Sequence, residues 1–91
     1  MTPRLRDGVS FAQTEYGLAL LDEERGSYWQ LNSTGVQVLR ALLAGRPAEA
    51  AVRELADEYG VDADSVHHDV QELVAALFAS GLLVRGEDGR P

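Results

Sequence analysis

The sequence has no cysteine and no long apolar run, and each absence excludes a class of structure. A chain without cysteine contains neither disulfide bonds nor thiolate metal sites, and its cysteine usage leaves the redox compartment undetermined. No apolar stretch approaches the ~18–20 residues that a transmembrane helix needs, so we expect neither a membrane span nor a signal peptide. The cytoplasm is therefore the expected location.

Positive charge is also scarce. Lys and Arg number 8 against 15 Asp and Glu, which gives a formal net charge of −7. Proteins that bind nucleic acid through its phosphates usually carry a basic surface. The pair Arg4 and Arg6 and the charged C-terminal tail are too sparse to form such a surface, so the composition argues against a nucleic-acid partner.

Motifs for catalysis or metal binding are missing from the sequence. His67 and His68 are adjacent, and neighbours on a helix point about 100° apart, unlike the i, i+4 pair of a helical zinc site. Neither a nucleophile elbow, nor a P-loop, nor a GxGxxG run is present. Glu23 and Glu24 form an ordinary carboxylate pair in a turn. We therefore expect a protein that is not an enzyme, with no catalytic residues, no cofactor and no metal.

The chain length suits a single domain, 1–91, with an ordered core over about residues 8–84. Alternating apolar and polar residues predict a first strand over Val9–Glu15. Leu18–Asp22 and Ser27–Leu31 flank a polar break that ends in Gly26, a pattern typical of a β-hairpin. Short connections predict an antiparallel meander whose third strand lies at an edge. Met1–Asp7 is expected to fray.

Three helices are predicted to follow the strands. Asn32 or Ser33 is expected to cap the first helix and Asp62 the third, while Pro47 suits the first turn of the second. Glycines are expected to end all three, at Gly45, Gly60 and Gly81. Apolar residues at helical spacing predict the buried faces: Val36, Val38, Leu39, Leu42 and Leu43, then Val52, Leu55, Ala56 and Tyr59, then Val66, Val70, Leu73, Val74, Leu77 and Phe78.

These elements predict an α+β fold of winged-helix-like type, with a three-stranded antiparallel sheet followed by three α-helices. The second and third helices resemble a helix-turn-helix pair. The apolar segment Leu82–Val84 is expected to fold back onto the core.

The third strand carries the most informative side chains, Tyr28 and Trp29. An edge strand exposes unpaired backbone N–H and C=O groups, and natural proteins usually blunt it with Lys, Pro or a bulge. Ser27–Leu31 contains neither Lys nor Pro. One interpretation is that the aromatic residues complete the core and cover the sheet. The other is that a peptide adds to this edge as a further strand, and the residues alone leave both open.

A set of residues over about 8–84 has a distinctive order and spacing: Leu21-Asp22, Gly26, Tyr28-Trp29, Leu31-Asn32, Gly45, Tyr59, Asp69-Val70, Leu73, Leu77 and Gly81-Leu82-Leu83. In this order they resemble the PqqD-like family of leader-peptide recognition elements, which serve pathways for ribosomally synthesised and modified peptides. Within that family the pattern resembles the stand-alone leader-binding proteins of lasso peptide clusters. One departure is Pro47, where the family often has a Thr that caps the second helix.

The resemblance implies a non-catalytic chain that binds the leader of a precursor peptide and raises its concentration near modifying enzymes. The leader would add as an antiparallel strand beside the third strand, with apolar side chains in the cleft toward the third helix. The implied partners are the leader, a leader-cleaving cysteine protease and an ATP-dependent cyclase. The implied peptide-binding residues are Tyr28, Trp29, Gln30, Leu31, Val66, Asp69, Val70, Leu73 and Leu77.

Two residue roles can be stated more closely. Trp29 and Leu31 share a face of the strand and are expected to face the third helix. Asp69 either accepts a hydrogen bond from a leader Tyr hydroxyl or amide, or is a surface carboxylate.

Two other functions stay open. A DNA-binding winged helix would use the third helix, yet that helix and its cap carry several carboxylates and no Lys or Arg, which would repel phosphates. A subunit of a larger assembly would use the edge strand for dimerisation.

Overall fold

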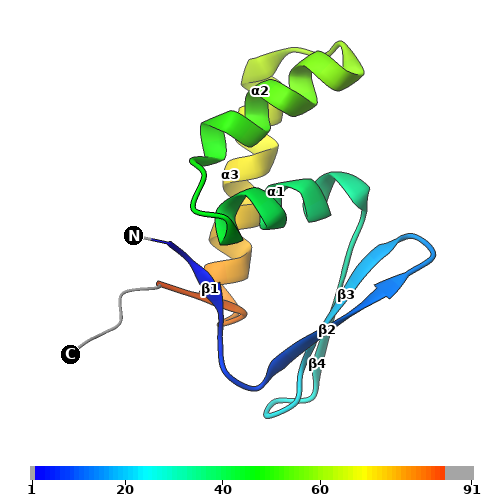
Figure 1. Ribbon diagram of the computed structural model, residues 1–91, viewed down its shortest axis with the longest axis vertical. Coiled ribbons are helices and arrows are strands. Elements are labelled where there is room, and N and C mark those ends of the chain that lie inside the picture. The colour runs from blue at the N-terminus through cyan, green and yellow to red at the C-terminus, as the bar shows by residue number, and fades with distance from the viewer. Residues whose placement is uncertain (1, 86–91) are drawn as a thin grey trace.

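A computed structural model describes residues 2–85 and confirms the predicted α+β fold. Three antiparallel strands, β2 (Val9–Thr14), β3 (Gly17–Asp22) and β4 (Ser27–Leu31), precede three helices. The helices are α1 (Ser33–Leu43), α2 (Ala48–Tyr59) and α3 (Ala63–Ala79). Two short strands, β1 (Arg4–Leu5) and β5 (Leu83–Val84), lie side by side apart from the main sheet (Figure 1).

The main sheet has the strand order β2-β3-β4, so β4 lies at an edge as predicted. Leu20 stands opposite Phe11 on one side and Trp29 on the other. Side chains alternate between the two faces of a sheet, and Leu18, Leu20 and Leu31 put the buried face toward the helices. The core therefore lies between the sheet and the three helices.

The prediction that Met1–Asp7 frays is wrong for the part that the structure describes. Arg4 pairs with Val84 and Leu5 with Leu83 in an antiparallel ladder, and the backbone N–H of Arg6 donates to the Leu82 carbonyl over 3.0 Å. Leu5 packs against the core while Leu83 is buried in it. The returning apolar segment thus gives the N-terminal residues a partner strand and a surface to cover.

Helix caps follow the sequence closely. The Asn32 side chain accepts a hydrogen bond from the Gly35 N–H over 2.9 Å at the start of α1. The Asp62 side chain accepts one from the Ser65 N–H over 3.2 Å at the start of α3. Pro47 is one residue earlier than predicted: it precedes α2 in an extended conformation and provides no side-chain cap.

The predicted buried faces are correct only in part. Val38, Leu39 and Leu42 of α1 and Val52 and Leu55 of α2 are buried, and in α3 Val70 and Leu77 are buried. Leu43 and Tyr59, predicted to be buried, are exposed, and the other predicted core residues of α3 are only half-buried: Val66, Leu73, Val74 and Phe78. For Tyr59, Val66 and Leu73 the reason is that no part of the described chain fills the space beside them.

Candidate functional site

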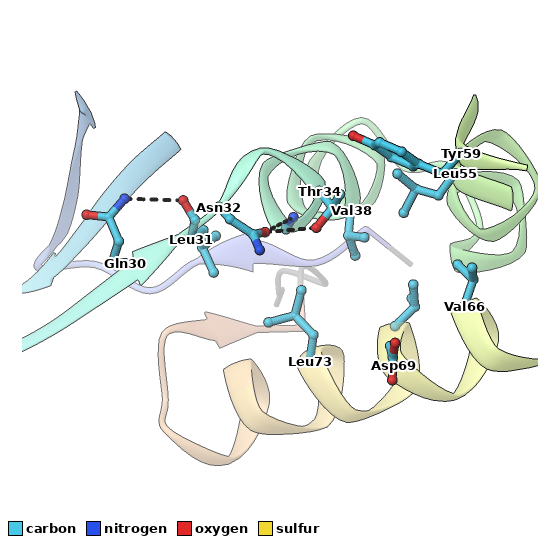
Figure 2. Close-up of a pocket in the computed structure, with 12 residues that line it drawn as sticks. Gln30, Leu31, Asn32, Thr34, Val38, Leu55, Tyr59, Val66, Asp69 and Leu73 are labelled. Carbon is cyan, nitrogen blue, oxygen red and sulfur yellow. Dashed lines mark hydrogen bonds between the residues drawn. The ribbon is translucent and has the colours of Figure 1, made fainter. Parts of the chain in front are cut away.

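A groove opens between the end of β4 and the three helices, with a cavity volume of about 490 Å³. Its lining comes from β4, the first turns of α1, the last turns of α2 and the first three turns of α3 (Figure 2). The residues that line it are Gln30, Leu31, Asn32, Thr34, Gly35, Val38, Leu55, Tyr59, Val66, Asp69, Val70 and Leu73.

The strand side of the groove ends at Leu31, which is buried, and continues into the Asn32 cap of α1. Trp29 shares the face of Leu31, as predicted, and packs partly buried against the core, but it does not line the groove. Tyr28 lies on the opposite face of the sheet with 63% of its surface exposed. The predicted strand residues therefore divide between the groove, the core behind it and the open face.

The backbone of β3 shows which strand neighbour each of its residues bonds. The Asp22 carbonyl accepts from the Gly26 N–H over 2.7 Å, on the β4 side. The Glu23 N–H donates to the Gly8 carbonyl over 3.0 Å, on the β2 side. Backbone groups in an antiparallel ladder alternate between the two sides from one residue to the next. Every second residue of β3, counted back from Asp22, therefore bonds toward β4.

This alternation fixes the direction of the backbone groups in β4. The β3 residues that bond toward β4 are Leu18, Leu20 and Asp22, and their register partners are Leu31, Trp29 and Ser27. The two remaining residues, Tyr28 and Gln30, direct their N–H and C=O groups away from β3. No described strand lies on that side, so these four groups form an open edge next to the groove.

The Gln30 side chain forms hydrogen bonds within the sheet. Its Nε2 lies 3.0 Å from Thr14 Oγ1, 3.3 Å from the Leu18 carbonyl and 3.2 Å from the Leu31 carbonyl. The Tyr28 hydroxyl donates to Gln30 Oε1 over 3.0 Å. These bonds tie all three strands together at the end of β4, so only the backbone of Gln30 remains for an incoming partner.

The helical wall consists of one face of α3. Val66, Asp69, Val70 and Leu73 follow one another at spacings of three, one and three residues, which places them on one side of a helix, and all four line the groove. Leu77, the next predicted member, has 0% of its surface exposed and belongs to the core instead. Asp69 is exposed, and no hydrogen bond or ion pair joins its carboxylate to another described residue.

Tyr59 is the main residue of the groove that the sequence pattern misassigned. It follows Leu55 by one helical turn and was predicted to be buried with it, yet 51% of its surface is exposed. Figure 2 shows Tyr59 and Leu55 at the far end of the groove, above Val66, and Leu73 nearer to the strand. The adjacent Gly60, which ends α2, signals that the last turn borders a connection and not the core.

The opposite end of β4 is fixed by an ionic network. The Arg6 guanidinium contacts the Asp22 carboxylate, which is 1% exposed, and also donates through Nε to the Gly81 carbonyl over 2.7 Å. Arg25 Nη1 donates to the Ser80 carbonyl over 3.0 Å. The hairpin that carries β4 is thereby bonded to the residues that follow the C-terminal end of α3.

Burial and nearby charge have opposite effects on the pKa of the Asp22 carboxyl. Burial by itself would raise the pKa of the Asp22 carboxyl, but the hydrogen bond and charge of Arg6, with the backbone N–H groups of Arg25 and Glu24, hold that pKa below its ordinary value. The group is therefore an anion that holds the N-terminal segment and the β3–β4 turn together.

Residues 2–85 contain no cluster of three His, Asp or Glu side chains that could hold a metal ion. His68 pairs with Glu72 one turn along the exposed side of α3, at 3.3 Å. No helix in the same part of the chain is long and apolar enough to span a membrane.

A family model described as coenzyme PQQ synthesis protein D (PqqD) matches residues 17–83, which is most of the chain. The chain belongs to the PqqD family. The sequence resemblance is thus confirmed, and the matched range contains every residue that lines the groove of this PqqD-family chain. The sequence matches no curated protein.

Two solved structures share the fold of this PqqD-family chain. One, described as lasso peptide synthetase B1 complexed with the leader peptide, is 36% identical with a TM-score of 0.85, over 93% of this chain and 100% of that one. The other, TbiB1 in complex with the TbiA(beta) leader peptide, is 28% identical with a TM-score of 0.77, over 97% of this chain and 100% of that one.

Proposed function

We propose that this chain binds the leader segment of a ribosomally synthesised precursor peptide, of the lasso class, by addition of the leader as a strand to β4. The observation that carries the proposal is the open edge at Tyr28 and Gln30 beside an apolar groove. Its support from outside the chain is that two similar proteins, TbiB1 and a lasso peptide synthetase B1, are described in complex with leader peptides.

An added strand satisfies two requirements at once. The two free N–H and two free C=O groups of the edge are paired by the peptide backbone. Alternate peptide side chains then point into the groove, because side chains alternate across a strand. In an antiparallel arrangement the C-terminal part of the peptide runs toward the β3–β4 turn, and its N-terminal part lies near Val66 and Tyr59.

The residue roles follow from position. Tyr28 and Gln30 contribute backbone pairing, and Leu31 contributes apolar contact at the strand side. Val66, Val70 and Leu73 contribute the opposite wall, and Leu77 supports them from the core. Trp29 packs behind the strand and keeps it in place, and Asp69 accepts a hydrogen bond from a leader Tyr hydroxyl or amide.

The proposed function is non-catalytic. Binding the leader raises the local concentration of the attached precursor near enzymes that also bind this chain. The proposed partners are a leader-cleaving cysteine protease and, later in the pathway, an ATP-dependent cyclase. We propose the cytoplasm as the location, because ribosomes release precursor peptides there.

Proline substitutions test strand addition, since proline lacks the backbone N–H. Gln30→Pro removes an N–H from the open edge and also the side-chain hydrogen bonds that join the strands, so Gln30→Ala is its matched control. We expect both variants to fold and only Gln30→Pro to lose binding of a labelled TbiA(beta) leader peptide. Trp29→Pro removes an N–H that bonds β3, so we expect it to unfold. Fluorescence polarisation measures binding and circular dichroism measures folding.

The same variants can refute the proposal. Undiminished binding by a folded Gln30→Pro variant would exclude strand addition at this edge. Sedimentation of the free chain at micromolar concentration separates a monomeric peptide binder from a dimer formed through β4.

A further inference from the structure

The end of the groove formed by α2 and α3 is acidic. Residues 54–84 contain seven carboxylates and no Lys or Arg: Glu54, Asp57, Glu58, Asp62, Asp64, Asp69 and Glu72. These residues belong to the second half of α2, the connection after it and α3, the elements that bring Tyr59 and Val66 to the groove.

Two of these carboxylates lie nearest the groove: one lines it, and the other is the N-cap of α3. Asp69 lines the groove directly. Asp62, one helical turn before Val66, accepts hydrogen bonds from the N–H and, over 3.4 Å, the hydroxyl of Ser65, but it has no cationic partner among the described residues. Arg46, in the loop before α2, is paired with Glu54. Arg53 of α2 lies next to Glu54 in the sequence, but among residues 2–85 neither Asp62 nor Asp69 forms an ion pair with a cation.

The other end of the cleft has a different charge. Arg6 and Arg25 lie there, against the C-terminal carbonyls of α3 and beside the carboxylates of Asp22 and Glu24. Carboxylate and guanidinium groups are interleaved at this end. Among the described residues, the carboxylates without an ion pair that lie nearest the groove are therefore found where α2 meets α3, whereas Arg6 and Arg25 lie beyond its other end.

The direction of the bound strand decides which part of the peptide lies at the acidic end. Under the proposed function, on which this inference rests, the peptide runs antiparallel to β4. The N-terminal part of the bound segment then lies at the acidic end, near the side chains labelled Tyr59, Val66 and Asp69 in Figure 2, and the C-terminal part leaves past the β3–β4 turn.

We infer that the groove selects leader peptides with a cationic segment immediately N-terminal to the residues that pair with β4. Lys or Arg side chains, or a free α-amino group, in that segment lie within the field of Asp62 and Asp69. Charge complementarity of this kind mainly raises the association rate and selects among partners. The apolar groove and the strand edge supply the affinity that remains at high salt.

The test uses the TbiA(beta) leader peptide, labelled and synthesised with three added residues at one end. Six peptides carry Lys, Gln or Glu triplets at the N-terminus or at the C-terminus. Stopped-flow fluorescence gives association rates at pH 8. At about 20 mM salt we expect the N-terminal Lys peptide to associate about threefold to tenfold faster than the N-terminal Glu peptide. The ratio should fall toward one at about 0.5 M salt.

Matched protein variants show whether the association rate depends on the charges at the acidic end or on the net charge of the protein. Asp62→Asn with Asp69→Asn removes two charges at the acidic end, and Asn preserves the helix cap. Asp7→Asn with Glu49→Gln removes two charges elsewhere, one that pairs with Arg4 near the N-terminus and one in the first turn of α2. The first pair should lower the Lys-to-Glu rate ratio at least about twofold, and the second should leave it nearly unchanged.

Any one of three results overturns the inference. The first is the same Lys-to-Glu rate ratio for N-terminal and C-terminal triplets, and the second is the same change in that ratio for both variant pairs. The third is no binding of the N-terminal Lys peptide. In the first two cases Gln30→Pro still reports on strand addition. Loss of binding in that variant, together with no charge preference, leaves the proposed function intact and refutes only the cationic segment.

Discussion

Leu73 and Leu77 lie one turn apart on α3 and offer a direct test of where the core ends and the groove begins. Leu77 has none of its surface exposed, whereas Leu73 is half-buried and lines the groove. The same substitution at both positions, leucine to alanine, therefore separates folding from binding within a single helix.

The structure gives a magnitude for each substitution. For Leu77→Ala, the lost burial and the enclosed cavity together should lower the free energy of unfolding by about 3–4 kcal/mol. For Leu73→Ala the space left joins the open groove, so no enclosed cavity forms and part of the side chain was already in contact with solvent. We expect a loss of about 1 kcal/mol in unfolding free energy and about tenfold weaker leader binding.

Urea denaturation and a fluorescence-polarisation titration of the TbiA(beta) leader are performed on both variants. The reasoning fails if Leu73→Ala loses as much stability as Leu77→Ala, because Leu73 would then belong to the core. It fails equally if Leu73→Ala binds the leader as tightly as the unaltered chain.

Three further predictions concern stability. The lowered pKa of Asp22 stabilises the fold above about pH 4, the ordinary range of an Asp carboxyl, and this contribution is lost as the pH falls through the lowered pKa. Asp22→Asn should therefore be less stable at neutral pH, and its stability should depend less on pH during acid denaturation. An unchanged acid denaturation profile would contradict the stabilising role of the Arg6–Asp22 ion pair. Asp62→Ala should cost about 1 kcal/mol of unfolding free energy through the lost cap, whereas Asp62→Asn should cost almost nothing; equal urea midpoints for the two would count against the cap. Gly17→Ala should lower the free energy of unfolding by at least about 2 kcal/mol, because the added Cβ would overlap the Leu31 carbonyl oxygen. Gly26→Ala should lower it only by the left-handed backbone penalty of about 1 kcal/mol, because nothing lies near its Cβ position. Thermal unfolding compares the two variants, and equal losses of stability would contradict the close approach of Gly17 to Leu31.

Local sequence signals were sufficient for the three strands of the main sheet, the three helices and their order. The polar break ending in Gly26 predicted the hairpin. Asp62 was correctly identified as a helix cap, and Asn32 is the cap of α1 among the two candidates, Asn32 and Ser33. Each of these depends on neighbours within a few residues, so the sequence pattern contains the whole interaction. The edge position of β4 also followed, because short connections allow only a meander.

Interactions between distant segments could not be predicted in this way. The pairing of β1 with β5 joins the two ends of the described chain, and the contact of Arg6 with Asp22 depends on it. Helical periodicity also does not distinguish a core from a groove. The apolar spacing of Tyr59, Val66 and Leu73 is the same whether a helix or solvent lies opposite, and only the packing of α2, α3 and β4 shows which.

Amide hydrogen exchange across β4, measured by NMR with and without saturating TbiA(beta) leader peptide, tests strand addition most directly. In the free chain the N–H groups of Trp29 and Leu31 bond β3 and should exchange slowly, while those of Tyr28 and Gln30 should exchange fast. Leader binding should slow the amides of Tyr28 and Gln30 by about tenfold or more and change those of Trp29 and Leu31 much less. Tight binding with Tyr28 and Gln30 still exchanging at their free rates would contradict the account.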